Sequence, residues 1–242
     1  MPKLLSLKAL LKKKYKYLEN LPEKFRNSFG DLTMGFVMVI WGESSNGKST
    51  LTTKILEVLI KYGKVMYISL EEGHRRSMQR LAEDTFAEEA HQGQIFFGNH
   101  EMTFAETMLT LKKRKSAKIV VIDSVQYWDI TIPDYKELKE TFPQKIFIFI
   151  SHAEGKQPDG KLAKKIKYDA DIKVRVEGFI AFVRSRFQGN HPYVIYEEGA
   201  RDYWGKDYAK KSTGIAKVKK AVKKKPAPVE ETETEETTET EN

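Results

Sequence analysis

The sequence predicts an α/β fold with a mostly parallel central sheet, helices on both of its faces and an added antiparallel hairpin. Short apolar runs alternate with helical patterns four times between residues 36 and 151, which is typical of a parallel sheet covered by helices. Two further β-rich stretches follow this region, over residues 174–187 and 192–198. At 242 residues, 40% of them hydrophobic, the chain can bury one core of ordinary size.

Five segments are predicted as strands of this sheet, because each is a short run rich in apolar and aromatic residues. They cover 36–41 (FVMVIW), 65–70 (VMYISL), 94–97, 118–123 and 145–151 (KIFIFIS). Helices are predicted between the strands over 48–61, 74–89, 103–115 and, more briefly, 134–141 after Pro133.

The pattern changes after residue 151. A polar, lysine-rich stretch over 152–168 precedes the β-rich segments VRVEGFIAFVRSRF and PYVIYEE, with Gly189 and Asn190 as the turn between these two. Turn residues between apolar runs indicate antiparallel strands. We therefore expect a hairpin at the edge of the sheet.

The two ends of the chain differ from this central domain, which we place at residues 28–205. Residues 1–27 form a basic segment in which leucines over 4–18 recur at roughly helical spacing. This helix could dock on its own core, on a neighbouring subunit or on a polyanion. Residues 206–242 are lysine-rich, then glutamate-rich, and have too few apolar residues to offset the entropy of ordering, so we expect them to be mostly disordered.

Composition and charge limit the function classes. The chain has no cysteine, which excludes disulfides and cysteine-ligated metal sites, and its five histidines lack metal-ligand spacing. No run of about 18 apolar residues and no secretory leader pattern is found, so we expect a cytoplasmic protein without membrane contact. Net charge is +8, and seven glutamates lie beyond residue 229, so the preceding part carries +15. This excess favours a polyanionic partner.

The segment GESSNGKST follows the first predicted strand directly and precedes a helix. It satisfies the pattern G-x-x-x-x-G-K-[ST], in which glycines let the loop curl around phosphates, the lysine reaches the β- and γ-phosphates, and the hydroxyl after it ligates Mg²⁺. ATP and Mg²⁺ are therefore the expected ligands. The residues predicted to bind ATP are Gly42, Glu43, Ser44, Ser45, Asn46, Gly47, Lys48, Ser49 and Thr50.

Acidic residues at two other strand ends complete the predicted site. Asp123 ends the run IVVID and is expected at the same carboxyl edge of the sheet, where it would hold Mg²⁺ together with Ser49. Because Ser124 follows it, the base that activates water must come from another strand end, and Glu71 and Glu72 follow the strand over 65–70. We favour Glu71, since the residue nearer the strand is better fixed, and leave Glu72 open.

These segments resemble the RecA superfamily, and within it the branch of RadA/Sms, the DnaB helicases and KaiC. GFVMVIWGESSNGKST, YISLEEG and VVIDSVQ look like that branch's Walker A segment, glutamate strand and Walker B strand. FISHAEG and VRSRFQGNH are similar to its later segments, and the resemblance covers about residues 28–200. It implies a catalytic role for Lys48, Glu71 and Asp123, a γ-phosphate sensor at His152, and a basic pair that reaches the neighbouring subunit's nucleotide, Arg184 and Arg186.

The resemblance also implies a homo-oligomer, either a ring or a filament, and a DNA path along the loops after the Walker B and sensor strands. Aromatic residues for base stacking and lysines for phosphates occur there: Tyr127, Trp128, Lys156, Lys161, Lys164, Lys165 and Lys167. The chain looks most similar to small phage or bacterial RecA-like ATPases that bind single-stranded DNA in recombination, repair or replication.

Other functions remain open at this point. They are a helicase-like core that translocates on DNA, a KaiC-like or signalling ATPase with a protein partner, and an ATP-binding scaffold with negligible turnover. The glutamate-rich tail could compete with DNA or recruit a basic protein. Annealing, strand exchange and unwinding are not distinguished by the sequence.

Overall fold

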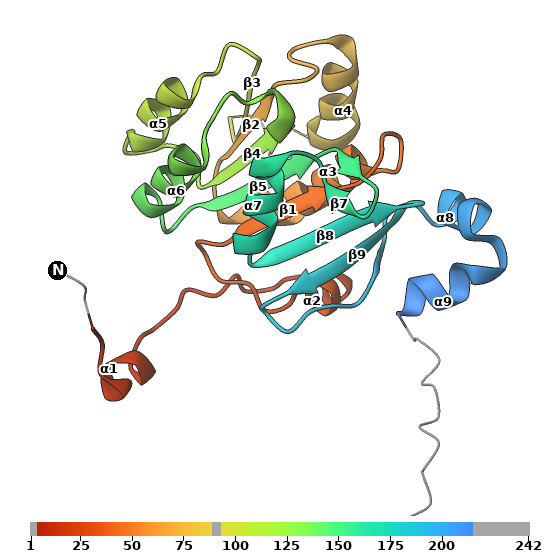
Figure 1. Cartoon of the computed structure of the whole chain (residues 1–242), viewed down its shortest axis with the longest axis horizontal. Coiled ribbons are helices and arrows are strands. Elements are labelled where there is room, and N and C mark those ends of the chain that lie inside the picture. Colours follow the sequence, from red (N-terminus) through yellow and green to blue (C-terminus); the bar gives the residue numbers. More distant parts are fainter. Residues whose placement is uncertain (1–3, 89–92, 215–242) are drawn as a thin grey trace, which may run out of the picture.

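The computed structural model describes residues 4–88 and 93–214, and an eight-stranded sheet forms its centre (Figure 1). The strand order is β10-β9-β8-β1-β5-β4-β2-β3, in which the six strands from β8 to β3 are parallel and β9 and β10 are antiparallel. The strands are β1 Val37–Trp41, β2 Val65–Ser69, β3 Ile95–Gly98, β4 Ile119–Asp123, β5 Ile146–Ser151, β8 Ile172–Glu177, β9 Ile180–Ser185 and β10 Tyr193–Val194. The predicted mostly parallel sheet with an added antiparallel hairpin is confirmed.

Helices cover both faces of the sheet, as predicted (Figure 1). One core cluster joins the sheet to α2 Glu23–Phe29, α3 Lys48–Leu59 and α4 Arg76–Phe86. The opposite cluster joins it to α5 Phe104–Lys112, α6 Ile132–Thr141 and α7 Lys161–Asp169. Because both faces are covered, β1 and β2 are buried along their whole length and read as continuous apolar runs.

Local signals explain where the helices begin. The side chains of Thr103 and Thr131 each accept a hydrogen bond from the backbone N–H three residues on, and the carboxylates of Glu106 and Asp134 accept one from the threonine backbone N–H. Such capping boxes satisfy amide groups that have no partner within the helix. Helix α6 therefore begins at Ile132, two residues before the predicted start, with Pro133 in its first turn.

The appended antiparallel part contains a turn that the sequence analysis missed. Strands β8 and β9 come from the single stretch VRVEGFIAFVRSRF and are joined at Gly178 and Phe179, whose φ angles are +52° and +58°. Two positive φ angles suit the short hairpin turn whose twist matches that of the strands. Gly189 and Asn190 lie in the next connection, from β9 to β10.

The polar, lysine-rich stretch over 152–168 is structured. It contains a small antiparallel pair, β6 Ala153–Glu154 with β7 Gln157–Pro158, followed by α7. Ala163 and Ile166 are the buried residues of α7, so only a narrow apolar stripe within a lysine-rich helix faces the core. This stripe is too short to stand out as a periodic pattern over the lysines around it.

The two ends also differ from expectation. The leucine-rich N-terminal segment forms a helix only over α1 Leu7–Leu11. Elsewhere, α3 is continued by a 3₁₀ turn at Ile60–Tyr62. After β10 the chain forms α8 Glu197–Trp204, a 3₁₀ turn at Gly205–Asp207 and α9 Tyr208–Thr213, so the first residues of the stretch 206–242, expected to be mostly disordered, are helical. The glutamate-rich tail lies outside the described residues. Within those residues, no helix is both long and apolar enough to cross a membrane.

Replacing Gly178 with alanine should destabilise the hairpin. A Cβ at Gly178 would lie 2.2 Å from Cδ1 of Tyr203 and 2.7 Å from Nε1 of Trp204, at a φ of +52°. Gly205→Ala is the matched control, because Gly205 has a φ of +48° but no atom within 4 Å of the added Cβ. We expect about 1–2 kcal/mol of destabilisation in the control from backbone strain alone, and a clearly larger loss in Gly178→Ala.

The measurement is thermal unfolding of both variants and the parent chain. In a domain of this size each kcal/mol lowers Tm by roughly 2–4 °C. Equal Tm values for the two variants would show that packing of α8 against the turn contributes nothing.

A candidate nucleotide-binding active site

The loop between β1 and α3 is shaped for phosphate. Gly47 adopts a φ of +96° directly before the first residue of α3, and Ser45 a φ of +61°. A Cβ at Gly42 would lie 2.3 Å from the carbonyl oxygen of Val176, so this position also requires glycine. The loop therefore curls around the N-terminus of a helix, where backbone amides and the helix dipole favour an anion.

A side chain ties this loop to the hairpin turn. Asn46 Oδ1 accepts a hydrogen bond of 2.6 Å from the backbone N–H of Gly178. On the other side of the turn, the indole of Trp204 donates to the carbonyl of Gly178 at 3.0 Å. The appended hairpin thus holds the phosphate loop from outside, a contact that the sequence motif alone does not reveal.

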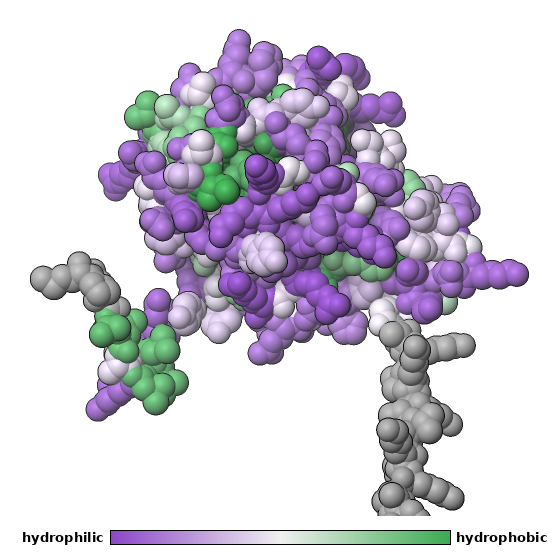
Figure 2. Space-filling model, viewed as in Figure 1, coloured by the Kyte–Doolittle hydropathy of each residue, from purple (hydrophilic) through white to green (hydrophobic). Residues whose placement is uncertain are grey.

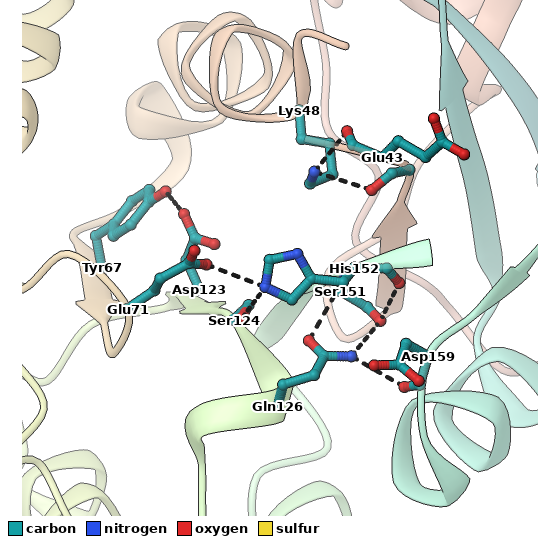
Figure 3. Close-up of polar contacts among 11 residues, drawn as sticks. Glu43, Lys48, Tyr67, Glu71, Asp123, Ser124, Gln126, Ser151, His152 and Asp159 are labelled. Carbon is teal, nitrogen blue, oxygen red and sulfur yellow. Dashed lines mark hydrogen bonds and ion pairs between the residues drawn. The ribbon is translucent and has the colours of Figure 1, made fainter. Parts of the chain in front are cut away.

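Lys48 directs its ammonium group back into the loop. Its Nζ donates to the carbonyl oxygens of Gly42 and Glu43, both at 2.9 Å (Figure 3). Burial lowers the pKa of Lys48, while the charges of Asp123 and Glu71 oppose this shift. The three predicted groups are therefore close enough in space to interact electrostatically.

Asp123 ends β4 inside the protein and is held by a tyrosine. The hydroxyl of Tyr67 donates to Asp123 Oδ2 at 2.5 Å (Figure 3), and Tyr67 is itself buried. Burial raises the pKa of Asp123 to about 6, the Tyr67 hydrogen bond counteracts this, and Glu71 and Glu72 raise it further. Lys48 lowers it. A carboxylate in such a place is stabilised by a cation beside it.

Tyr67 is a site residue that the sequence analysis missed. Its signal is a tyrosine in the middle of the apolar run VMYIS. Tyr67 lies on the same side of β2 as Ser69, which pairs with Asp123 across the strands. Burial of a tyrosine hydroxyl requires a polar partner. The neighbouring strand β4 ends in Asp123, which is the partner of the Tyr67 hydroxyl.

Glu71 and His152 come together from two strand ends. Glu71 follows β2 and His152 follows β5, and Glu71 Oε2 lies 3.2 Å from His152 Nε2 (Figure 3). The same ring nitrogen lies 3.5 Å from the hydroxyl of Ser124. The Glu71 side chain is 40% exposed, so it keeps access to solvent while the histidine fixes its direction.

Gln126 links the end of β4 to the end of β5, and the sequence analysis did not assign it a role. Its amide nitrogen donates to Ser151 Oγ at 2.8 Å and to the Asp159 carbonyl at 2.9 Å. Its oxygen accepts from the His152 backbone N–H at 3.3 Å. Gln126 thereby joins the histidine to the turn that precedes α7 (Figure 3).

The residues present fit Mg²⁺ together with a nucleotide. Among the described residues no group of three His, Cys, Asp or Glu side chains could hold a metal ion. Mg²⁺ takes most of its ligands from phosphates and water and needs only one or two protein oxygens, which Ser49 and Asp123 would supply here. The half-buried Asp123 carboxylate near the lysine of the phosphate loop matches this requirement.

The predicted arginine pair lies away from this site. Arg184 is near the end of β9, where Ser185 pairs with Ile172 and Ile172 aligns with Met38, toward the start of β1. The phosphate loop follows the opposite end of β1. Arg186 forms an ion pair with Asp171 at 3.2 Å. Neither arginine is brought to the chain's own phosphate loop, so a role toward a neighbour's nucleotide stays a prediction.

The residues predicted to contact DNA are only partly available. Trp128 is 4% exposed and packs beside Phe104, so its ring offers no open face to a base. Tyr127 is 56% exposed, with its ring edge-on to His152. Four of the five lysines lie on α7, the exception being Lys156. Of these, Lys164 pairs with Glu154 at 2.6 Å and Lys167 lies 4.8 Å over the Trp41 ring.

Comparison with known proteins bears on the fold. No protein-family model and no curated protein sequence matches the chain. The flagellar accessory protein FlaH from Methanocaldococcus jannaschii is similar in structure, with a TM-score of 0.55 and 13% identity over 73% of this chain and 91% of that one. The KaiC-like protein PH0186 from Pyrococcus horikoshii OT3 gives 0.52 and 15% over 71% and 89%.

This chain has a RecA-like fold. The carboxyl ends of the parallel strands lie at one edge of the sheet, and the loop after β1, Asp123 and Glu71 are found there. The prediction of a RecA-like fold is confirmed. At 13% and 15% identity, this similarity is one of fold alone.

Removing the Tyr67 hydroxyl should weaken Mg²⁺ binding. In Tyr67→Phe the Asp123 carboxylate loses a charge-assisted hydrogen bond that contributes about 1.5 kcal/mol or more. We expect about a tenfold rise in the Mg²⁺ concentration needed for half-maximal binding of a fluorescent ATP analogue. Tyr62→Phe is the control, since the Tyr62 hydroxyl donates to the Glu19 carbonyl, remote from Asp123. An unchanged Mg²⁺ requirement in Tyr67→Phe would contradict this role.

Proposed function

We propose that this protein is a Mg²⁺-dependent ATPase of the RecA-like type whose nucleotide state is read by a protein partner. The observation that carries the proposal is that Lys48, Asp123 and Glu71, from three separate segments, lie together at one edge of the sheet (Figure 3). An apolar core does not require the half-buried charges of Lys48 and Asp123 at that place, because removing charged groups from water costs free energy. A triphosphate with its metal ion fits these charges.

Each residue then has a defined task. The loop amides and the Lys48 ammonium bind the β- and γ-phosphates, and Ser49 and Asp123 hold the Mg²⁺ ion, which neutralises phosphate charge. Glu71 orients the attacking water and accepts its proton, the usual role of a carboxylate beside a dissociating phosphoryl group. His152, 3.2 Å from Glu71, fixes the direction of that carboxylate.

The same contacts provide a route from the nucleotide to the surface. A γ-phosphate near Glu71 competes for the contacts of His152, whose backbone is bonded to Gln126. Gln126 is bonded in turn to Asp159, next to α7. Helix α7 therefore senses whether ATP or ADP is bound, and its exposed face is the surface that a partner reads.

We further propose that the active form is a homo-oligomer with ATP between protomers. Arg184 and Arg186 lie away from the chain's own phosphate loop, toward the opposite end of β1, which suits a pair that completes a neighbour's site. In that arrangement Arg186 exchanges its pairing with Asp171 for a phosphate.

A protein partner is favoured over DNA by the accessibility of the predicted DNA residues. The Trp128 ring is covered, and two of the α7 lysines are engaged within the chain. The KaiC-like name of one similar structure matches this alternative from the sequence analysis. Single-stranded DNA is the second candidate, favoured by the +15 charge of residues 1–229 and by the exposed Tyr127.

Replacing Glu71 should separate catalysis from binding. Glu71→Gln keeps the size and the contact with His152 but removes the base, so we expect kcat for ATP hydrolysis to fall by about 10²- to 10⁴-fold with nucleotide affinity unchanged. Lys48→Ala should lose both turnover and binding. Glu72→Gln is the matched control for charge and should keep near-parental turnover.

Phosphate release under saturating Mg²⁺-ATP, beside binding of a fluorescent ATP analogue, measures these effects. Parental turnover in Glu71→Gln would refute the catalytic assignment. A parent chain that binds ATP without turnover would instead indicate the scaffold function.

The partner class is tested by adding single-stranded DNA. If the partner is a protein, oligothymidylate at 50–200 mM salt should change the ATP hydrolysis rate less than twofold. Stimulation that weakens steeply with salt and is lost in the double variant Lys161→Ala/Lys165→Ala would establish the DNA-dependent ATPase instead.

A further inference from the structure

The segment 4–15, which we name the N-terminal leucine segment, has an apolar surface that no other part of the chain described by the structure covers. Figure 1 shows α1 standing clear of the sheet and its helices, and Figure 2 shows the green of its leucines there. No residue of α1 is buried. The exposed fractions are 94% for Leu4, 61% for Leu5, 72% for Leu7, 49% for Leu10 and 75% for Leu11.

These leucines form a face of their own. Within α1, Leu7, Leu10 and Leu11 are three and four residues apart and therefore share one side of the helix. Ser6 caps this helix by accepting a hydrogen bond of 3.2 Å from the N–H of Ala9. The helix is thus set up by its own sequence, although its apolar side faces solvent.

Charge along the segment has one sign only. Residues 1–18 contain six lysines and no acidic residue, the first being Glu19, and the lysines are Lys3, Lys8, Lys12, Lys13, Lys14 and Lys16. Tyr15 and Tyr17 follow the leucines and are 53% and 57% exposed. Apolar side chains, cations and amphipathic aromatic rings are thereby combined in one short stretch.

The domain fixes the far end of the segment. Leu18 is 5% exposed and donates its backbone N–H to the Leu32 carbonyl at 2.8 Å, while Met34 donates to the carbonyl of Lys16 at 3.1 Å. The bridge between Tyr17 and Thr33 adds a further backbone link. The leucines are consequently displayed from a fixed point on the domain.

Two other binding partners, a second copy of the chain and a nucleic acid, would suit either the leucines or the lysines but not both. An apolar hollow on a second copy, lined by Met66, Phe96 and Ala117, would suit leucines but is edged by like charges at Lys64, Lys113 and Lys115. A nucleic acid would pair with the lysines but would leave the aliphatic side chains in water. A surface that accepts both the leucines and the lysines is a hydrocarbon layer covered by fixed negative charges.

We propose that the N-terminal leucine segment binds the surface of an anionic lipid bilayer. Leu7, Leu10 and Leu11 enter the boundary of the acyl chains, the lysines lie among acidic headgroups, and the tyrosines sit at the level between them. Binding needs both signals, because a short apolar face or a basic patch alone gives weak attachment. The ATPase domain is thereby held beside the membrane.

The test is sedimentation of the full chain with vesicles of phosphatidylcholine alone or with 30% phosphatidylglycerol. We expect binding to the anionic vesicles, at least tenfold weaker binding to the neutral ones, and loss of binding at high salt. Leu7→Ser/Leu11→Ser and, separately, Lys12→Glu/Lys13→Glu should each reduce binding at least tenfold. Leu109→Ser, on α5, is the matched control, since Leu109 is 64% exposed.

Because the segment has no packing in the domain, thermal unfolding of these variants should match the parent chain. No binding of the parent chain to anionic vesicles would overturn the proposal. So would equal binding by Leu7→Ser/Leu11→Ser, which would assign attraction to the charge of the whole chain. Loss of oligomerisation or of oligothymidylate binding in that variant, with vesicle binding intact, would assign the leucines to a second copy or to DNA.

Discussion

A buried parallel strand can carry a charged side chain only where its apolar run ends, and this constraint organises the whole molecule. Strands β1, β2, β4 and β5 are covered on both faces, so the first polar groups appear at their carboxyl ends. Since the strands are parallel, these ends meet at one edge. Lys48, Glu71, Asp123 and His152 are neighbours there although more than one hundred positions separate the first from the last.

This constraint explains why much of the fold and part of the site could be predicted. Apolar runs locate parallel strands well, because burial on both faces leaves little ambiguity about which residues belong to them. The strand end then identifies Asp123 and Glu71 without knowledge of any contact. By contrast, Gly178 sits inside one continuous β-rich stretch, and the turn there depends on backbone angles that no apolar pattern reports.

The side chains that orient the site were harder to predict for a related reason. Tyr67 lies within a strand and Gln126 within a 3₁₀ turn, and each acquires its role only from a partner on another strand. Trp128 shows the opposite error, because a position after a strand suggested exposure while the ring packs beside Phe104 in the core. The roles of Tyr67, Gln126 and Trp128 depend on contacts with residues far away in the sequence. Local sequence patterns do not specify which distant residues will be in contact.

The bond between Asn46 and Gly178 has a mechanical consequence. Gly178 is held on one side by the amide oxygen of Asn46 and on the other by the indole of Trp204, so two hydrogen bonds in series join α8 to the phosphate loop. Helix α8 projects from the rim of the sheet (Figure 1), so these two hydrogen bonds extend from the rim to the loop between β1 and α3. A molecule that displaced α8 would therefore act on the backbone at Gly178 and, through Asn46, on that loop.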